Sequence, residues 1–211
     1  MANESFQPND VLDFWFPDTG HQNAIETHGA FFQERMQGGM DETIINGFAE
    51  LTHAAATGRL DHWADTARGR LALLIALDQF PRSLWRDTPA AYAQDIKAAR
   101  LALDGIKNRD IDELQPWESV FFIIAITHCE GPDHLERIDS LNEEVDKITT
   151  RLPATISQMG AGFVNQQAKA RKIIERFGRH SHRNEILGRI STPSEEDYIA
   201  IGDFPHINKS S

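Results

Sequence analysis

The chain has 211 residues, of which 40% are hydrophobic and 25% are charged, and its formal net charge at pH 7 is −11. These values are typical of one globular domain over residues 1–211, with a structured core at about residues 8–202, and they exclude global disorder. The negative charge disfavours nucleic acids and anionic membranes as partners, and the single cysteine, Cys129, excludes an intrachain disulfide.

Neither a membrane span nor a signal peptide is visible in the sequence. The longest apolar stretches, Leu71 to Leu77 and Val120 to Ile126, are too short to cross a bilayer. The first residues, Met1 to Phe6, have neither the basic region nor the apolar core of a signal peptide. We therefore expect a soluble, cytoplasmic protein.

Nearly every segment has the apolar spacing or the end signals of a helix. The expected helices are, in chain order, residues 8–16, 23–36, 41–57, 66–80, 90–106, 116–129, 133–150, 161–177 and 194–201. Thr88-Pro89 and the capping box Thr192-Pro193-Ser194-Glu195 mark two of the starts, and Gly178 marks one of the ends.

The helix expected at residues 66–80 is the most hydrophobic, which predicts a central position in the core. Alternating apolar and polar runs typical of strands are absent from the sequence, and the short connections favour antiparallel helical hairpins. No clean repeat of the tetratricopeptide signature occurs. The sequence therefore predicts an all-α fold, either an irregular helical-repeat domain or a helix bundle.

Two polar clusters interrupt otherwise apolar helical segments, and we expect them to be neighbours in space. The first contains Asp78, Gln79 and Arg82, and Asp78 lies on the helical face of Leu71 and Leu74. The second cluster has the sequence Arg-His-Ser-His-Arg-Asn over residues 179–184 and continues to residue 189. Charges facing a core are unfavourable unless they are paired, so Asp78 is either a structural partner of an arginine or a carboxylate in a pocket.

His128 and Glu130 are further candidates for chemistry. His128 shares a helical face with Phe121 and Ile124, and Glu130 follows near the expected helix end. This histidine is either a structural core residue or, with a carboxylate, part of a general acid–base set. Cys129 is adjacent to His128, but adjacent helical side chains point about 100° apart, which disfavours a Cys–His nucleophile pair.

The charges of two segments are opposite. Lys169 to Arg189 holds seven basic and two acidic residues, whereas Glu130 to Asp146 holds seven acidic residues and one arginine. Converging arginines are suited to a carboxylate or a phosphate. The alternative is that the two segments simply face each other or that both are solvated.

Cofactor motifs are missing from the sequence. It contains no glycine-rich dinucleotide motif, no P-loop, no GxSxG and no HExxH, and its histidines never occur four residues apart. We therefore expect no cofactor and no metal. The alternative for a metal is a site assembled from His128, Glu130 and His182.

Four motifs in their order resemble the DUF924 family of uncharacterised bacterial proteins. They are Val11 to Phe16, Leu77 to Arg86, His128 to Glu130, and Phe177 to Pro193. This resemblance implies an all-helical, tetratricopeptide-like array of antiparallel hairpins in a single domain, and no established activity. It also implies a shared polar centre, which consists of Asp78, Gln79, Arg82, His128, Glu130, Arg179, His182, Arg183, Asn184 and Arg189.

The chain departs from the family pattern at three places. His180-Ser181 stands where the family has Phe-Pro, Cys129 stands where it has serine, and Ala170 stands where it often has histidine. These departures weaken the transfer of a catalytic role more than they weaken the expected fold.

Two functions of different classes follow. The first is a binding module that holds an anionic small molecule or an acidic peptide terminus. Its binding residues would be Asp78, Gln79, Arg82, Arg179, His182, Arg183, Asn184 and Arg189. The second is a hydrolase-type or isomerase-type enzyme, in which His128 or His182 acts as acid or base with Asp78 or Glu130. A third possibility is a structural or partner-binding role, in which the clusters only lock helices together.

Overall fold

A computed structural model describes residues 6–204, and their regular secondary structure is helical, without a β-strand. The helices are α1 Pro8–Trp15, α2 Ile25–Met36, α3 Asp41–Gly47, α4 Ala49–Ala56, α5 Ala67–Leu74, α6 Phe80–Leu84, α7 Asp95–Asn108, α8 Asp110–Glu113, α9 Pro116–His128, α10 His134–Asp139, α11 Asn142–Thr150, α12 Met159–Phe177 and α13 Pro193–Ile201. The predicted all-α class is confirmed. The segment from Met1 to Ser5, on which the signal-peptide argument mainly rests, lies outside the described residues.

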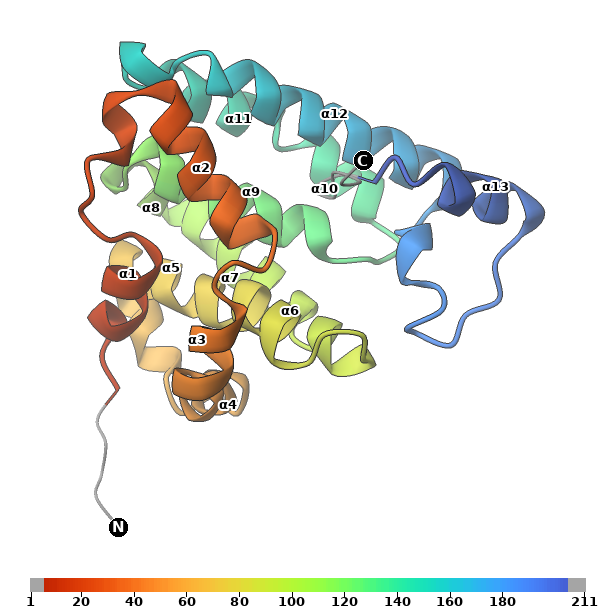
Figure 1. Cartoon of the computed structure of the whole chain (residues 1–211), viewed down its shortest axis with the longest axis horizontal. Helices are drawn as coiled ribbons and strands as arrows, with labels where there is room; N and C mark the ends of the chain where they lie inside the picture. The colour runs from red at the N-terminus through yellow and green to blue at the C-terminus, as the bar shows by residue number, and fades with distance from the viewer. Residues whose placement is uncertain (1–5, 205–211) are drawn as a thin grey trace.

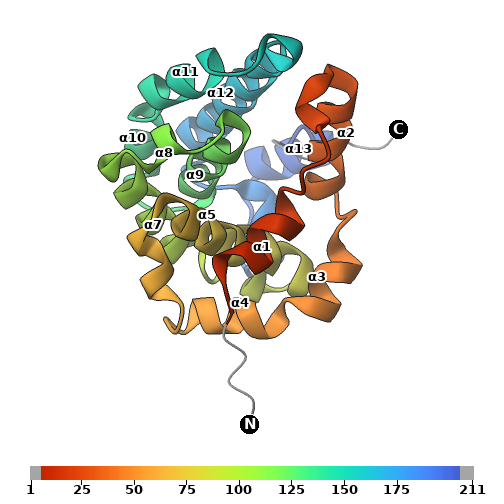
Figure 2. The same ribbon diagram turned by 90° about the vertical axis from the view of Figure 1, so that its left-hand side faces the viewer.

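The helices form one domain, in which helices close in sequence pack against each other (Figures 1 and 2). Helix α9 packs against α5 and α7 on one side and against α10 and α11 on the other, and α12 packs against α10 and α11. This arrangement is consistent with the tetratricopeptide-like array that the family resemblance implies. None of the described helices is both long and apolar enough to cross a membrane.

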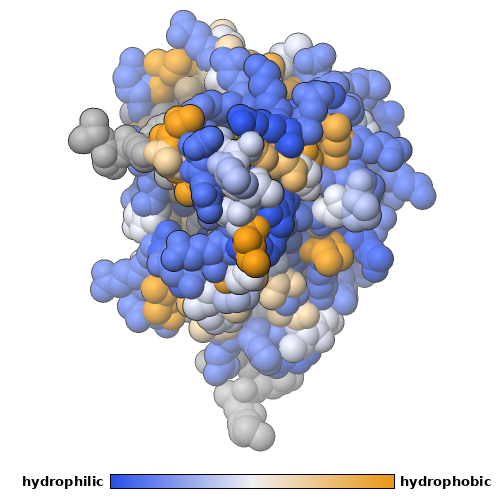
Figure 3. All heavy atoms as spheres, turned by 90° about the vertical axis from the view of Figure 1, so that its right-hand side faces the viewer, coloured by the Kyte–Doolittle hydropathy of each residue, from blue (hydrophilic) through white to orange (hydrophobic). Residues whose placement is uncertain are grey.

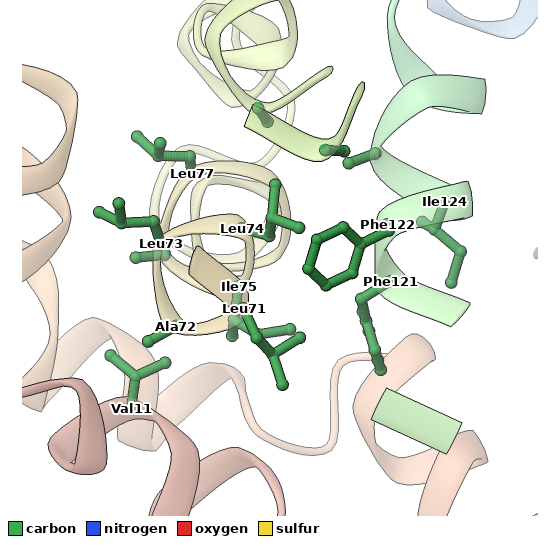
Figure 4. Close-up of a cluster of buried hydrophobic side chains, with 14 of the residues drawn as sticks. Val11, Leu71, Ala72, Leu73, Leu74, Ile75, Leu77, Phe121, Phe122 and Ile124 are labelled. Carbon is green, nitrogen blue, oxygen red and sulfur yellow. The ribbon is translucent and has the colours of Figure 1, made fainter. Parts of the chain in front are cut away.

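The core is centred on α5 and the turn that follows it, as the sequence predicts. Leu71, Leu74 and Ile75 are almost completely buried there. Figure 4 shows Leu74 against the ring of Phe122 from α9, while Val11 of α1 covers the other side of α5. The stretch from Leu71 to Leu77 is apolar and buried on all sides, so it needs such neighbours around it, which explains why α1, α7 and α9 all contact α5.

The segment after α5 carries the first polar cluster and differs from the predicted helix end at residue 80. Ile75–Gln79 forms a π-helical turn, and the Phe80 N–H donates to the carbonyl of Ile75. The chain then continues helically through Pro81 as α6. Because proline has no N–H, a regular α-helical bond cannot form at that position, and π turns of this kind occur frequently at functional sites.

Three other predicted helices differ from the structure, because two of them are interrupted and one begins later. The helix expected at residues 41–57 breaks at Phe48, whose ring packs against those of Phe14 and Phe80. The helix expected at 133–150 breaks after Asp139, where Ser140 Oγ bonds the carbonyl of residue 137 and competes with the helical pattern. The helix expected at 90–106 begins only at Asp95, because Pro89–Tyr92 forms a 3₁₀ turn.

A histidine pair is buried between α2 and the turn before it. The Nδ1 atoms of His21 and His28 lie 2.8 Å apart, so one ring donates and the other accepts. The ring of His21 also stacks on Phe31, with 3.8 Å between ring centroids. Burial, and then the neighbouring charge of His21, lowers the pKa of His28 to about 4.

We predict that acid destabilises the protein through His28. The folded protein keeps this ring neutral down to about pH 4, whereas an unfolded histidine binds a proton near pH 6.5. The contribution of His28 is therefore complete above pH 6.5 and is lost as the pH falls towards 4, by on the order of 3 kcal/mol. Urea unfolding at pH 7 and pH 4.5 measures it. His28→Gln should reduce this pH dependence, whereas His53→Gln, at an exposed position, should leave it unchanged.

Candidate functional site

The first polar cluster meets the end of α9 inside the molecule. Asp78 is 1% exposed, and its Oδ1 accepts a hydrogen bond from His128 Nδ1 at 2.8 Å. The same carboxylate accepts from Gln79 and, at 3.4 Å, from Nη2 of Arg82. Arg82 is four residues beyond Asp78, so the π turn and α6 together bring it to the same side as His128.

A carboxylate that the sequence analysis did not single out joins the first cluster to the second. Asp95, at the start of α7, accepts from Arg82 Nη2 at 2.6 Å and from Arg183 Nη1 at 2.9 Å. Arg183 Nη1 also donates to the His128 carbonyl at 2.9 Å. Both guanidiniums also lie over the ring of Tyr92, with their central carbons 4.6 and 4.5 Å from its centroid. The predicted neighbourhood of the two clusters is confirmed.

The sequence did contain a signal for Asp95. Residues three, four and seven positions further on, Ala98, Ala99 and Ala102, are all buried, so Asp95 lies on the apolar face of α7. This is the same pattern that singled out Asp78. It was weaker here because alanines mark a buried face less clearly than leucines do.

The charges around Asp78 decide its protonation state. Burial by itself would raise its pKa, but the charge and hydrogen bond of His128, followed by the charge of Arg82, lower the pKa of Asp78 to about 2. The carboxylate is therefore ionised at neutral pH. An ionised carboxylate only accepts hydrogen bonds, so Nδ1 of His128 carries a hydrogen.

Arg82, His128 and Arg183 line a cavity of about 340 Å³. Its wall is rich in basic side chains and also includes Arg35, Arg86, His180 and His182, against only two acidic residues, Asp41 and Asp87. Asp41 is paired with Arg86. Asp78 and Asp95 do not line the cavity, so the carboxylates that hold the arginines in place lie behind them.

Some side chains of this wall carry buried polar atoms with no hydrogen-bond partner among residues 6–204. Among these atoms are Nε of Arg183, Nδ1 of His180 and Nε1 of Trp15. The Nε2 atom of His180 donates to the Thr127 carbonyl at 3.0 Å, so its Nδ1 is left as an acceptor. Burial, and then the charge of Arg183, holds the pKa of His180 well below its usual range. Buried polar groups are nearly always hydrogen-bonded, so two donors and one acceptor here suit a polar ligand.

Glu130 forms an ion pair with Arg189 and does not line the cavity. Its Oε1 accepts from the backbone N–H of His180 at 2.7 Å and from Arg189 Nη2 at 3.3 Å, and its other oxygen also accepts from Arg189. Arg189 in turn donates to the carbonyl of His180 at 3.1 Å. These bonds attach the segment after α12 to the end of α9.

Arg179 and Ser181 hold the same segment to α13, and Asn184 links two parts of the segment. Both nitrogens of the Arg179 fork donate to Glu195 at 2.8 Å, and Ser181 Oγ donates to Glu195 at 3.0 Å. Asn184 Nδ2 donates to Ser191 Oγ at 3.0 Å. Arg179, Asn184 and Arg189 thus do not line the cavity, but they position the segment from which Arg183 reaches it.

The basic and acidic segments face each other in part. Arg171 of α12 forms a two-bond pair with Asp139 of α10, at 2.5 and 3.1 Å, and Arg189 pairs with Glu130. Arg183, however, reaches a carboxylate outside the acidic segment. The molecular face that carries α13 is mainly hydrophilic, with hydrophobic residues in small separate groups (Figure 3).

The structure also places the residues at which the chain departs from the family pattern, and it bears on the candidate metal site. His180 and Ala170 both line the cavity. Cys129 is buried, and burial raises the pKa of its thiol, which disfavours a nucleophilic role. Within residues 6–204, no three His, Cys, Asp or Glu side chains come together in an arrangement that could hold a metal ion.

The comparisons with known proteins agree with the resemblance. The DUF924 family, described as bacterial proteins of unknown function, matches residues 11–203, and the chain belongs to this family. The solved structure of a protein of unknown function from Agrobacterium tumefaciens, ATU0120, is 30% identical, with a TM-score of 0.66. That match covers 92% of this chain and 97% of the other. A search of the curated proteins found no match.

Proposed function

We propose that this member of the DUF924 family binds a small organic anion, a carboxylate or a phosphate, between Arg82 and Arg183. The observation that carries the proposal is the buried Nε of Arg183, a charged donor without a partner among the described residues, in a side chain that lines the cavity. Asp95 and the ring of Tyr92 already hold both guanidiniums in place. A preorganised arginine fork loses little freedom when it binds a planar or tetrahedral anion.

The geometry also explains why the arginines retain affinity for an anion. Both arginines line the cavity, whereas their structural carboxylates, Asp78 and Asp95, do not. The acceptor at His180 Nδ1 favours an anion that also carries a hydroxyl or another donor. Cys129 is a free, buried thiol, and free thiols are typical of proteins in the reducing cytoplasm. We therefore propose a cytoplasmic location as well.

A thermal-shift screen with acetate, lactate, inorganic phosphate and glycerol phosphate tests this function. A ligand at a hundredfold excess over its Kd should raise the melting temperature by about 5–10 °C. Arg183→Ala should abolish the rise. Arg183→Lys keeps the charge beside Asp95 but removes the fork, and it should reduce the rise strongly.

Arg171→Ala is the matched control, because Arg171 is also ion-paired but lies outside the cavity. It should leave the response of the wild type intact. A full response in both Arg183 variants would show that the anion binds elsewhere.

A second candidate function, general acid–base catalysis, is favoured by the 2.8 Å contact between His128 and Asp78. With Nδ1 bound to an ionised carboxylate, Nε2 is the basic nitrogen of the ring, as in other carboxylate-oriented histidines. Arg82 and Arg183 would stabilise negative charge that develops on a substrate. Of the residues suggested by the sequence, His128 with Asp78 fits this role, while Glu130 is engaged by Arg189.

Turnover distinguishes the two functions. Each stabilising anion is incubated with the protein and followed by NMR spectroscopy for loss of signal. An enzyme would consume its substrate, and His128→Gln should slow that reaction about 10²- to 10⁴-fold while the anion still binds. If the wild type returns each anion unchanged, catalysis is contradicted and only the binding function stands.

A further inference from the structure

A second cavity, of about 470 Å³, lies next to the first, between α2, α9, α11 and α12. Its wall contains Phe32, Trp117, Val120, Leu152 and Phe163, and no Asp, Glu, Lys or Arg is part of it. The only titratable side chain in that wall is His28, whose low pKa keeps it neutral at pH 7. This second cavity is therefore uncharged and largely apolar, in contrast to the arginine-rich first cavity.

The two cavities share part of their walls. Met36, at the end of α2, and Ile124, in α9, line both of them. Ile124 lies one helical turn before His128, so the same face of α9 continues from the apolar cavity into the basic one. Met36 is a flexible side chain that adapts readily to the shape of a bound molecule.

We infer that the ligand is amphipathic, with an anionic head at Arg82 and Arg183 and a single hydrocarbon tail in the second cavity. This inference rests on the proposed function, because it takes the head from that site. A short anion would occupy only the first cavity and would leave the adjoining apolar wall without contacts. A tail that passes Met36 and Ile124 gains the burial of its apolar surface, which is the main source of affinity in such cavities.

Isothermal titration with ethyl, butyl, hexyl and octyl phosphate, and with carboxylates of matching length, tests the inference. All are used below their micellar concentrations. Each added methylene group should tighten binding about fourfold, which corresponds to about 0.8 kcal/mol, until the second cavity is full. The two series identify which head group is preferred.

Two glycines allow the second cavity to be filled without disturbing the first. Gly29 of α2 and Gly162 of α12 line it, and a Cβ atom added at either would meet no atom within 4 Å. The double variant Gly29→Leu/Gly162→Leu should abolish most of the dependence on chain length and change ethyl phosphate binding less than twofold. Gly47→Leu is the matched control, because Gly47 is helical and equally open but lines neither cavity.

The outcomes separate the inference from the function on which it rests. Affinity that does not change with chain length, but is lost in Arg183→Ala, would overturn the inference and keep the anion site. Length-dependent binding that persists in the double glycine variant would overturn the placement of the tail. Tail binding that persists in Arg183→Ala would overturn the placement of the head. A failure of every probe to bind would overturn both proposals.

Discussion

Replacing Asp95 with asparagine will lower the free energy of unfolding by about 3–5 kcal/mol. The substitution keeps the shape of the side chain but removes the carboxylate that pairs with both Arg82 and Arg183. The Arg183 side chain is only 5% exposed, so its charge would remain in the interior without an ionic partner. Of its two ion pairs, Arg82 would keep only the longer one, with Asp78 at 3.4 Å.

Urea unfolding of the wild type and of Asp95→Asn measures this loss. A second substitution, Arg183→Met, made together with Asp95→Asn, should restore part of the stability because it removes the stranded charge. Asp139→Asn, at the exposed pair with Arg171, should change stability little and serves as the control. If Asp95→Asn is no worse than Asp139→Asn, the bridge does not hold the two clusters together.

Replacing Glu195 with alanine will detach the segment over residues 179–192 from α13, at a cost of about 2–3 kcal/mol. Glu195 is 2% exposed and accepts bonds from the Arg179 fork, from Ser181 Oγ and from the backbone N–H of Thr192. This residue does not line the cavity, yet Arg183 projects from the segment that it holds. Anion binding should therefore weaken as well.

The pH dependence of the stability of this variant tests the role of Glu195 independently. The Arg179 fork holds the pKa of Glu195 well below its usual range, so the folded protein keeps the carboxylate ionised at acid pH. The contribution of Glu195 to stability is present above the ordinary glutamate pKa and is lost as the pH falls below it. Glu195→Ala should therefore lose less stability than the wild type on acidification to pH 3.

Glu196→Ala is the control, because Glu196 is the next residue of α13 and is exposed. It should match the wild type in stability, in anion binding and in its acid response. Equal behaviour of the Glu195 and Glu196 variants would mean that α13 does not hold this segment in place.

The first polar cluster could be recognised in the sequence because a charged residue on an apolar helical face is conspicuous. Asp78 stands out against Leu71 and Leu74, and the structure places it 1% exposed at the end of the core helix. The charge pattern marked Arg183 only as part of a basic segment, and the family resemblance placed it in a shared polar centre. Its partner, Asp95, is 88 residues away in the chain, and no local pattern indicates such a pairing.

Other parts of the cavity come from turns and from distant helices. Tyr92 belongs to a 3₁₀ turn within a segment for which the sequence predicted a regular helix. Arg35 belongs to α2, a helix whose apolar spacing in the sequence is weak. Both line the cavity, together with residues of α6 and α9, because tertiary packing brings these separate elements to the same place. The signals that predict a helix concern neighbours within about four residues, so they carry no information on which helix faces which.

The sequence by itself predicted that the protein is helical, that the apolar segment before Asp78 is central, and that two polar clusters are neighbours in space. Apolar periodicity, end signals and the cost of burying charge are local properties, which a single chain displays directly. Tertiary structure alone decided that Asp95 joins the clusters and that a basic cavity adjoins an apolar one at Met36 and Ile124. These features depend on where α2, α7, α9 and α12 lie relative to one another, because long-range packing sets which side chains meet.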